Sequence, residues 1–148
     1  MTKQQGKRLT AVGLKKLEST LNERIRLLVY GNQFNVNIHT FFRESLIENI
    51  ITNYVTILQE LQEGTEVDDT LIKGSLGVFN TLVLREFTDL PIPKTNDIES
   101  LIVVSNTLLD TGIMKEIYDA IPPEQLIKIE EKLKSVQSNF EQVVGTLK

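Results

Sequence analysis

Several residue types on which small functional sites depend are missing or rare in this chain. The 148 residues include no cysteine, no tryptophan and a single histidine, His39. The absence of cysteine excludes disulfide frameworks, thiolate zinc sites and cysteine nucleophiles. With one histidine, a two-histidine metal site is excluded within one chain, and a serine triad would have to place His39 as its base. Because His39 lies beside apolar residues and no nucleophile motif is present, we expect no enzyme activity, no metal site and no cofactor.

Phosphate-binding and calcium-binding motifs are also lacking. Residues 73–77 have the composition of a phosphate loop, but their order is wrong and the residues before them have a helical pattern. The acidic turn of Glu63, Glu66, Asp68 and Asp69 lacks the alternating aspartates, central glycine and closing glutamate of a helix-loop-helix calcium site. Its acids are better explained as solvated residues at the start of a helix.

Long apolar runs are absent as well. No run reaches the roughly 18 residues of a membrane span, and residues 1–10 lack the apolar core of a secretory signal. The hydrophobic fraction of 41% and charged fraction of 24% are typical of a globular protein. We therefore expect one soluble, cytoplasmic domain over residues 1–148, with no membrane among its partners.

Apolar residues spaced by three and four run through most of the chain. They predict an all-α fold, a compact bundle of about five to six helices. The first helix is expected from about Thr10 to Tyr30, where Gly31 and Asn32 end it. One side of this helix carries its apolar positions: Leu14, Leu17, Leu21, Ile25 and Leu28.

Turn and cap residues divide the rest of the chain. Thr40 can cap the second helix, and in the third Gly74 and Gly77 either allow a close helix crossing or break the helix. Pro91 and Pro93 require an extended connector after this helix. Further boundaries follow: a cap at Asn96 or Asp97, an end at Thr111 and Gly112, a short helix from Ile113 to Ile121, and a stop at Pro122 and Pro123.

Residues 34–39 have a different pattern. Phe34, Val36 and Ile38 alternate with polar residues, as in a short strand or a half-buried loop. No other segment alternates so cleanly. If the segment is a strand, we therefore expect a second copy or a partner to supply its pairing strand.

The final helix, residues 124–148, has the sharpest periodicity. Its apolar residues repeat every seven positions: Leu126, Ile129, Leu133, Val136, Phe140, Val143 and Leu147. Such a stripe either docks along the first helix of the same chain or makes a coiled contact with another subunit, which would form a homo-oligomer.

The N-terminal end is basic. Lys3, Lys7, Arg8, Lys15 and Lys16 precede the first acid, so this start carries +5, and the net charge of −4 leaves −9 for the remainder. A basic arm, residues 1–10, on an acidic body is either a solvated tail or a contact for nucleic acid or an acidic protein surface.

Three stretches resemble a known group of proteins. Asn35–Ile38 leads into an apolar helix, residues 85–90 read Arg-Glu-Phe-Thr-Asp-Leu, and residues 108–122 contain Leu-Leu-Asp-Thr-Gly-Ile-Met followed by Ile117, Ala120, Ile121 and Pro122. Together they resemble small helical proteins encoded among the structural genes of tailed bacteriophages of Gram-positive hosts, nearest to tail assembly chaperones and minor virion components. The resemblance covers about residues 35–133 and carries over no site residues. It implies binding to a phage structural protein, in the host cytoplasm or in the particle.

Two functions remain at this point. The first is a non-catalytic protein-binding protein that holds a partner through its terminal segments and the extended segment. Its candidate contacts are Lys3, Lys7, Arg8, Phe34, Val36, Ile38, Val136, Phe140 and Val143. The alternative is a small nucleic-acid-binding regulator that uses the basic arm, although no helix has a continuous basic face.

Overall fold

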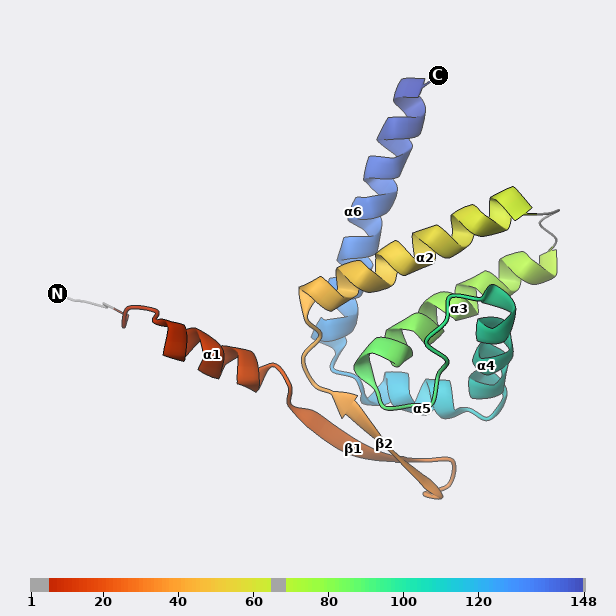
Figure 1. Ribbon diagram of the computed structural model, residues 1–148. Coiled ribbons are helices and arrows are strands. Elements are labelled where there is room, and N and C mark those ends of the chain that lie inside the picture. The colour runs from red at the N-terminus through yellow and green to blue at the C-terminus, as the bar shows by residue number, and fades with distance from the viewer. Residues whose placement is uncertain (1–5, 65–68, 148) are drawn as a thin grey trace.

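The computed structural model describes residues 6–64 and 69–147. This part of the chain is mostly helical, as expected, but it also contains a two-stranded antiparallel sheet, so the all-α prediction is wrong in that respect. The elements are α1 (Ala11–Thr20), β1 (Arg24–Val29), β2 (Phe34–His39), α2 (Glu44–Gly64), α3 (Asp69–Phe87), α4 (Ile98–Asp110), α5 (Ile113–Ala120) and α6 (Pro123–Leu147). In Figure 1, α2 to α6 form a helical body, the hairpin lies against one end of it, and α1 projects away.

The predicted first helix is only half as long as expected. Thr10 caps α1 by accepting a 3.1 Å hydrogen bond from the backbone N–H of Gly13, and Leu21 is the C-cap. Residues 24–29 form β1 instead, although Ile25 has helical spacing. The apolar residues of β1 fit the two-residue period of a strand as well as the spacing of a helix. A strand can also form hydrogen bonds with the backbone groups of β2, which a helix cannot do.

The extended segment at 34–39 is a strand, and the partner strand comes from the same chain. The register runs from Arg24 opposite His39 to Val29 opposite Phe34, which corrects the expectation that a second copy or a partner pairs with it. The turn places three consecutive residues at positive φ: Tyr30 (56°), Gly31 (62°) and Asn32 (64°). Glycine and asparagine tolerate this conformation best, so the residues expected to end a helix make a hairpin turn.

The core joins the hairpin to the helices. Val29, Val36 and Ile38 are buried on the face that the sheet turns toward the body. Beside them Phe42 and Phe87 stack in parallel, with ring centroids 3.9 Å apart. The backbone N–H of Phe42 donates a 2.9 Å hydrogen bond to the buried Gln125 Oε1 of α6, which ties the start of α2 to α6.

The helix boundaries of the body follow the turn signals with one exception. Asp97 caps α4 by accepting from the backbone N–H of Ser100, and Thr111 and Gly112 end it, as expected. Thr40 does not cap α2, because its N–H and hydroxyl donate to the carbonyl of Glu23 and the helix begins only at Glu44.

The glycines of α3 and the prolines that follow it have the structural roles that their backbone geometry allows. The glycines do not break α3, which is continuous from Asp69 to Phe87. A side chain at Gly77 would overlap the hydroxyl of Ser105, so this glycine marks the close crossing of α3 and α4. The connector after α3 is non-helical through Pro91 and Pro93, and Pro123 occupies the first turn of α6.

The last helix packs against α2 and not against α1, which corrects the expected docking along the first helix. Ile129 is buried, and Leu126 and Leu133 pack on the core. The backbone of α6 then continues to Leu147 and rises away from the body in Figure 1. Within residues 6–64 and 69–147, no helix combines the length and the apolar character needed to cross a membrane.

Candidate interaction surface

Helix α1 is an amphipathic helix without a covering. None of its residues is buried, and Val12, Leu14 and Leu17 are 55 to 67% exposed, as is Leu9 just before it. Leu14 and Leu17 lie one turn apart and share a face with Leu21. A ten-residue helix is marginal in water on its own, so a surface that covered this face would stabilise it.

Hydrogen bonds at the base of α1 fix where the chain enters the hairpin. Asn22 Oδ1 accepts a 2.6 Å hydrogen bond from Arg43 Nη2. The carbonyl of Glu23 accepts a 3.0 Å bond from the backbone N–H of Thr40. These contacts hold the base near the start of α2 while α1 itself points away from the body (Figure 1).

Further exposed apolar side chains lie on the hairpin. Ile25 and Phe34 lie at the open ends of the sheet face whose centre is buried, and Leu28 lies on the opposite face. The rings of Tyr30 and Phe34 stack at the tip with centroids 6.2 Å apart. We call the whole set the N-terminal surface: Leu9, Val12, Leu14, Leu17, Ile25, Leu28, Tyr30 and Phe34.

One ionisable side chain anchors the tip of the hairpin to the body. Glu116 Oε2 of α5 accepts a 3.0 Å hydrogen bond from the backbone N–H of Tyr30. The tip therefore has a defined position, while its aromatic rings remain largely exposed. An apolar patch held on an anchored element is typical of a protein-binding surface.

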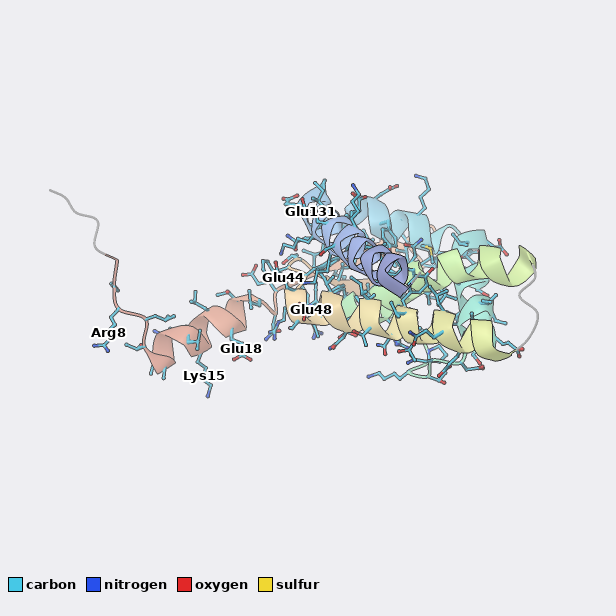
Figure 2. All side chains as sticks on the ribbon, turned by 90° about the horizontal axis from the view of Figure 1, so that it is seen from above. Arg8, Lys15, Glu18, Glu44, Glu48 and Glu131 are labelled. Carbon is cyan, nitrogen blue, oxygen red and sulfur yellow. The ribbon has the colours of Figure 1, made fainter. Side chains whose placement is uncertain are left out.

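Positive and negative charges are concentrated in different parts of the chain. Residues 1–43 contain eight Lys and Arg and two Glu, a net +6, so the total of −4 leaves −10 for residues 44–148. Figure 2 shows Arg8 and Lys15 on the projecting segment and Glu44, Glu48 and Glu131 on the body. The apolar N-terminal surface is therefore flanked by basic side chains, and the body presents acids.

A polar cleft of about 460 Å³ lies between the hairpin and the end of α3. Its lining comprises Arg24, Asn37, His39, Arg85, Glu86, Thr88, Asp89 and Lys94. Two of its charged groups serve the fold. The Asp89 carboxylate accepts two 2.9 Å hydrogen bonds, from the backbone N–H and the side-chain amide of Asn37. The Arg85 guanidinium donates to the carbonyls of Pro93 and Thr95 and to Asn96 Oδ1.

The only histidine of the sequence, His39, lines this cleft. Burial lowers the pKa of His39 below its ordinary value, and the positive charges of Arg24 and Arg43 lower it further. Its ring lies edge-on to Phe87, with centroids 6.4 Å apart. A neutral ring packed on the core fits a structural role. In the described part of the chain, no three metal-binding side chains gather into a cluster, and the predicted acidic turn lies mainly outside that part.

The predicted contact residues have different outcomes. Lys7, Arg8 and Phe34 are exposed. Val36 and Ile38 are buried in the chain's own core, at 4% and 0% exposure, so they are not available to a partner and their assignment as contacts is wrong. Lys3 lies outside the described residues, and so do the side chains of Val136, Phe140 and Val143.

Two exposed residues of the surface, Leu14 and Leu17, were not among the predicted contacts. The sequence placed both on the apolar side of the first helix, and such a side usually faces a core. One available signal was Thr10, which caps a helix, together with the polar residues 18–20 and 22–23, which shorten the stripe to two turns.

One comparison with known proteins identifies the family. A family model described as YomO matches residues 11–148, which include α1, the hairpin and every helix of the body. No curated protein and no solved structure matches the chain. Because the family match covers far more than half of the sequence, the chain belongs to the YomO family.

Proposed function

We propose that this chain is a non-catalytic, protein-binding component of bacteriophage assembly, acting as a tail assembly chaperone or as a minor component of the particle. The observation that carries the proposal is the N-terminal surface, eight large apolar side chains that are exposed on and beside α1 and on the hairpin. Monomeric proteins rarely leave such a patch uncovered, because covering it contributes about 25 cal/mol for each Å² removed from water.

The chemistry of the chain supports binding over catalysis. Asp89, Arg85 and Glu116 are charged groups that hold the hairpin and the connector in place. The resemblance of residues 35–133 to small phage structural proteins points to an assembly partner, and the family's name is associated with phages, which is consistent with that origin.

The test uses the full chain with an affinity tag, in cells that produce the phage encoding it. We expect the wild type to capture a structural protein of the particle. The double substitution Leu28→Asp and Phe34→Asp should reduce capture by about tenfold or more, because it places two charges in an apolar contact. Val103→Asp is the matched control, since Val103 is also an exposed aliphatic residue (64%) but lies on α4.

Two results would overturn the proposal. One is that no structural protein is captured and that the chain is also absent from purified particles. The other is equal capture by the wild type and the hairpin variant. A steeply salt-dependent shift of DNA or RNA without protein capture would instead favour the nucleic-acid alternative, because phosphate contacts release counterions.

A further inference from the structure

We propose that the open edge of β1 binds an extended segment of the partner protein, in which acidic and apolar side chains alternate, as a third strand of the sheet. This inference depends on the proposed function, because it names the part of the phage structural protein that the hairpin recognises. Recognition of this kind, in which a peptide adds a strand to a free sheet edge, is common. Three features of the hairpin support it: outward backbone groups, exposed apolar side chains beside them, and an arginine without a partner.

The hydrogen-bond pattern of the hairpin shows which backbone groups of β1 face its open edge. In an antiparallel pair, opposite residues alternate between those that bond to each other and those whose N–H and C=O point away. Glu23 and Thr40 form a bonded pair, since the Thr40 N–H donates to the Glu23 carbonyl at 3.0 Å. Along the register from this pair, Arg24, Arg26 and Leu28 direct their N–H and C=O groups away from β2.

Contacts on both edges of the hairpin agree with this pattern. Asn37 lies opposite Arg26, and its N–H and carbonyl bond to Asp89, on the edge of β2 that faces away from β1. Tyr30 is the next residue in the outward series of β1, and its N–H donates to Glu116 of α5 at 3.0 Å. The edge of β2 is therefore occupied at Asn37, and the edge of β1 is closed at its tip.

The stretch from Arg24 to Leu28 is the open part of the β1 edge. Among residues 6–64 and 69–147, no group outside the hairpin forms a hydrogen bond with the backbone of this stretch. In Figure 1, β2 lies between β1 and the end of α3, so β1 is the outer strand. A free edge of this kind is a template for a further strand, because each outward N–H and C=O can pair with a second backbone.

The side chains beside the open edge determine the apolar half of the pattern. On the face toward the body, Ile25 is 41% exposed and Leu27 is half-buried. An added strand continues both faces of the sheet, with successive side chains on opposite faces. Every second side chain of the segment would therefore lie beside Ile25 and Leu27, where an apolar side chain removes further apolar surface from water.

Charge on the other face determines the acidic half of the pattern. The hairpin, residues 24–39, contains no Asp or Glu and two arginines, Arg24 and Arg26. Arg24 lines the cleft beside β2 together with Glu86 and Asp89, so acids of its own chain already lie near it. Arg26 makes no hydrogen bond or ion pair through its side chain with any residue that the structure describes. A carboxylate opposite Arg26 on an added strand would form a favourable cross-strand pair.

The same charges disfavour pairing of β1 with β1 of a second copy. Such a contact would bring Arg24 and Arg26 of both copies onto one face of the joined sheet. Like charges on neighbouring strands are destabilising. An acidic segment of another protein meets no such repulsion, so it is the occupant that the edge favours.

The first experiment measures binding of a synthetic peptide to the full chain by fluorescence anisotropy. The probe is a labelled peptide of about eight residues, blocked at both ends, in which glutamate alternates with valine. We expect saturable binding. Two control peptides should each bind about tenfold or more weakly: one has lysine in place of glutamate, and the other has the same glutamates and valines in two separate blocks.

Two substitutions at one position separate backbone pairing from charge. Arg26→Ala removes the charge and should weaken binding of the alternating peptide about two- to fivefold. Arg26→Pro also removes the outward N–H and should weaken binding by about tenfold or more. Asn35→Pro is the matched control, because Asn35 lies opposite Leu28 and its N–H points to the other edge of the hairpin. This control should change binding by less than about twofold, and circular dichroism checks the fold of each variant.

Amide hydrogen exchange of the wild type, followed by NMR, tests the same edge without any substitution. Outward amides of a free edge exchange readily, because water reaches them. With the alternating peptide at saturation, the amides of Arg26 and Leu28 should exchange about tenfold or more slowly. The amide of Asn35 should exchange as before. This measurement identifies the paired edge even if Arg26→Pro unfolds the hairpin.

The inference is overturned if the alternating peptide does not bind, or if either control peptide binds equally well. It is also overturned if the amides of Arg26 and Leu28 keep their exchange rates while the peptide is bound. These outcomes are distinct from failure of the proposed function. Capture of a phage structural protein without peptide binding removes only the role of the edge. Peptide binding without such capture removes the assembly function and leaves β1 as a strand-binding edge.

Discussion

Two helices of this chain use the same kind of pattern with opposite results. In α1, Leu14 and Leu17 repeat with helical spacing and are more than half exposed. In α4, Leu101 and Leu108 repeat in the same way and are buried. The difference lies in the neighbours, since α4 crosses α3 closely at Gly77 whereas, in the described part of the chain, no residue of α1 is buried. Periodicity thus shows which face of a helix is apolar and does not show what covers it.

The hairpin lies between these extremes. Its inner face contributes Val29, Val36 and Ile38 to the core, while its ends and tip remain exposed. A hairpin alone is marginally stable, so its position depends on contacts with the body. Ile38 of β2 forms a single antiparallel β-bridge with Thr88, just after α3. The next residue, Asp89, accepts a hydrogen bond from the backbone N–H of Asn37. The segment after α3 therefore pairs with the edge of β2 that β1 leaves open.

The largest expected difference in the free energy of unfolding is between a substitution in the core of the body and one on α1. Phe87→Ala removes one ring of the buried pair with Phe42 and should lower the free energy of unfolding by about 3–5 kcal/mol. Leu17→Ala, measured by denaturant titration at a concentration where the chain is monomeric, should change it by less than about 0.5 kcal/mol. Comparable losses from the two substitutions would show that α1 is packed into the core after all.

A smaller effect is expected where the hairpin joins the body. Asp89→Ala removes two hydrogen bonds to Asn37 and should cost about 1–2 kcal/mol. Hydrogen exchange at the Asn37 amide should speed up more than exchange at the centre of α2. If both amides accelerate equally, the hairpin and the body unfold as one unit and the loss is global.

The smallest effect concerns His39. Its pKa is lowered in the folded protein by burial and by Arg24 and Arg43, so below the ordinary value of 6.5 the unfolded chain binds the proton more readily. The free energy of unfolding should therefore fall as the pH drops through this range, and the wild type should lose more than His39→Gln between about pH 7 and pH 5. Parallel curves for the two proteins in denaturant titrations at each pH would contradict this.

Much of the body could be predicted from cap and turn residues. Asp97, Thr111, Gly112 and Pro123 stand at helix boundaries, because a side-chain acceptor, a left-handed residue or a missing amide acts within a few residues. The hairpin could not be predicted in this way. Residues 24–29 fit a helix and a strand equally well, and only pairing with β2 decides between them.

The candidate site could also be predicted only in part, because local patterns do not show which residues the fold buries. The basic residues Lys7 and Arg8 and the aromatic Phe34 are exposed, as a partner contact requires. Val36 and Ile38 are not, because the alternation that marks a strand does not reveal which face meets the body. The exposure of Leu14 and Leu17 depends on which distant residues lie near them, and no local pattern records that.

The amino-acid sequence by itself determined that this protein is largely helical, where most of its helices begin and end, and that its basic start precedes an acidic body. These properties depend on backbone conformation, capping and charge, which act over short distances along the chain. Only the tertiary structure decided that residues 24–29 pair with 34–39, that α6 packs on α2, and that the stripe on α1 stays exposed. Each of these depends on which distant surfaces meet, because burial is a property of the assembled fold.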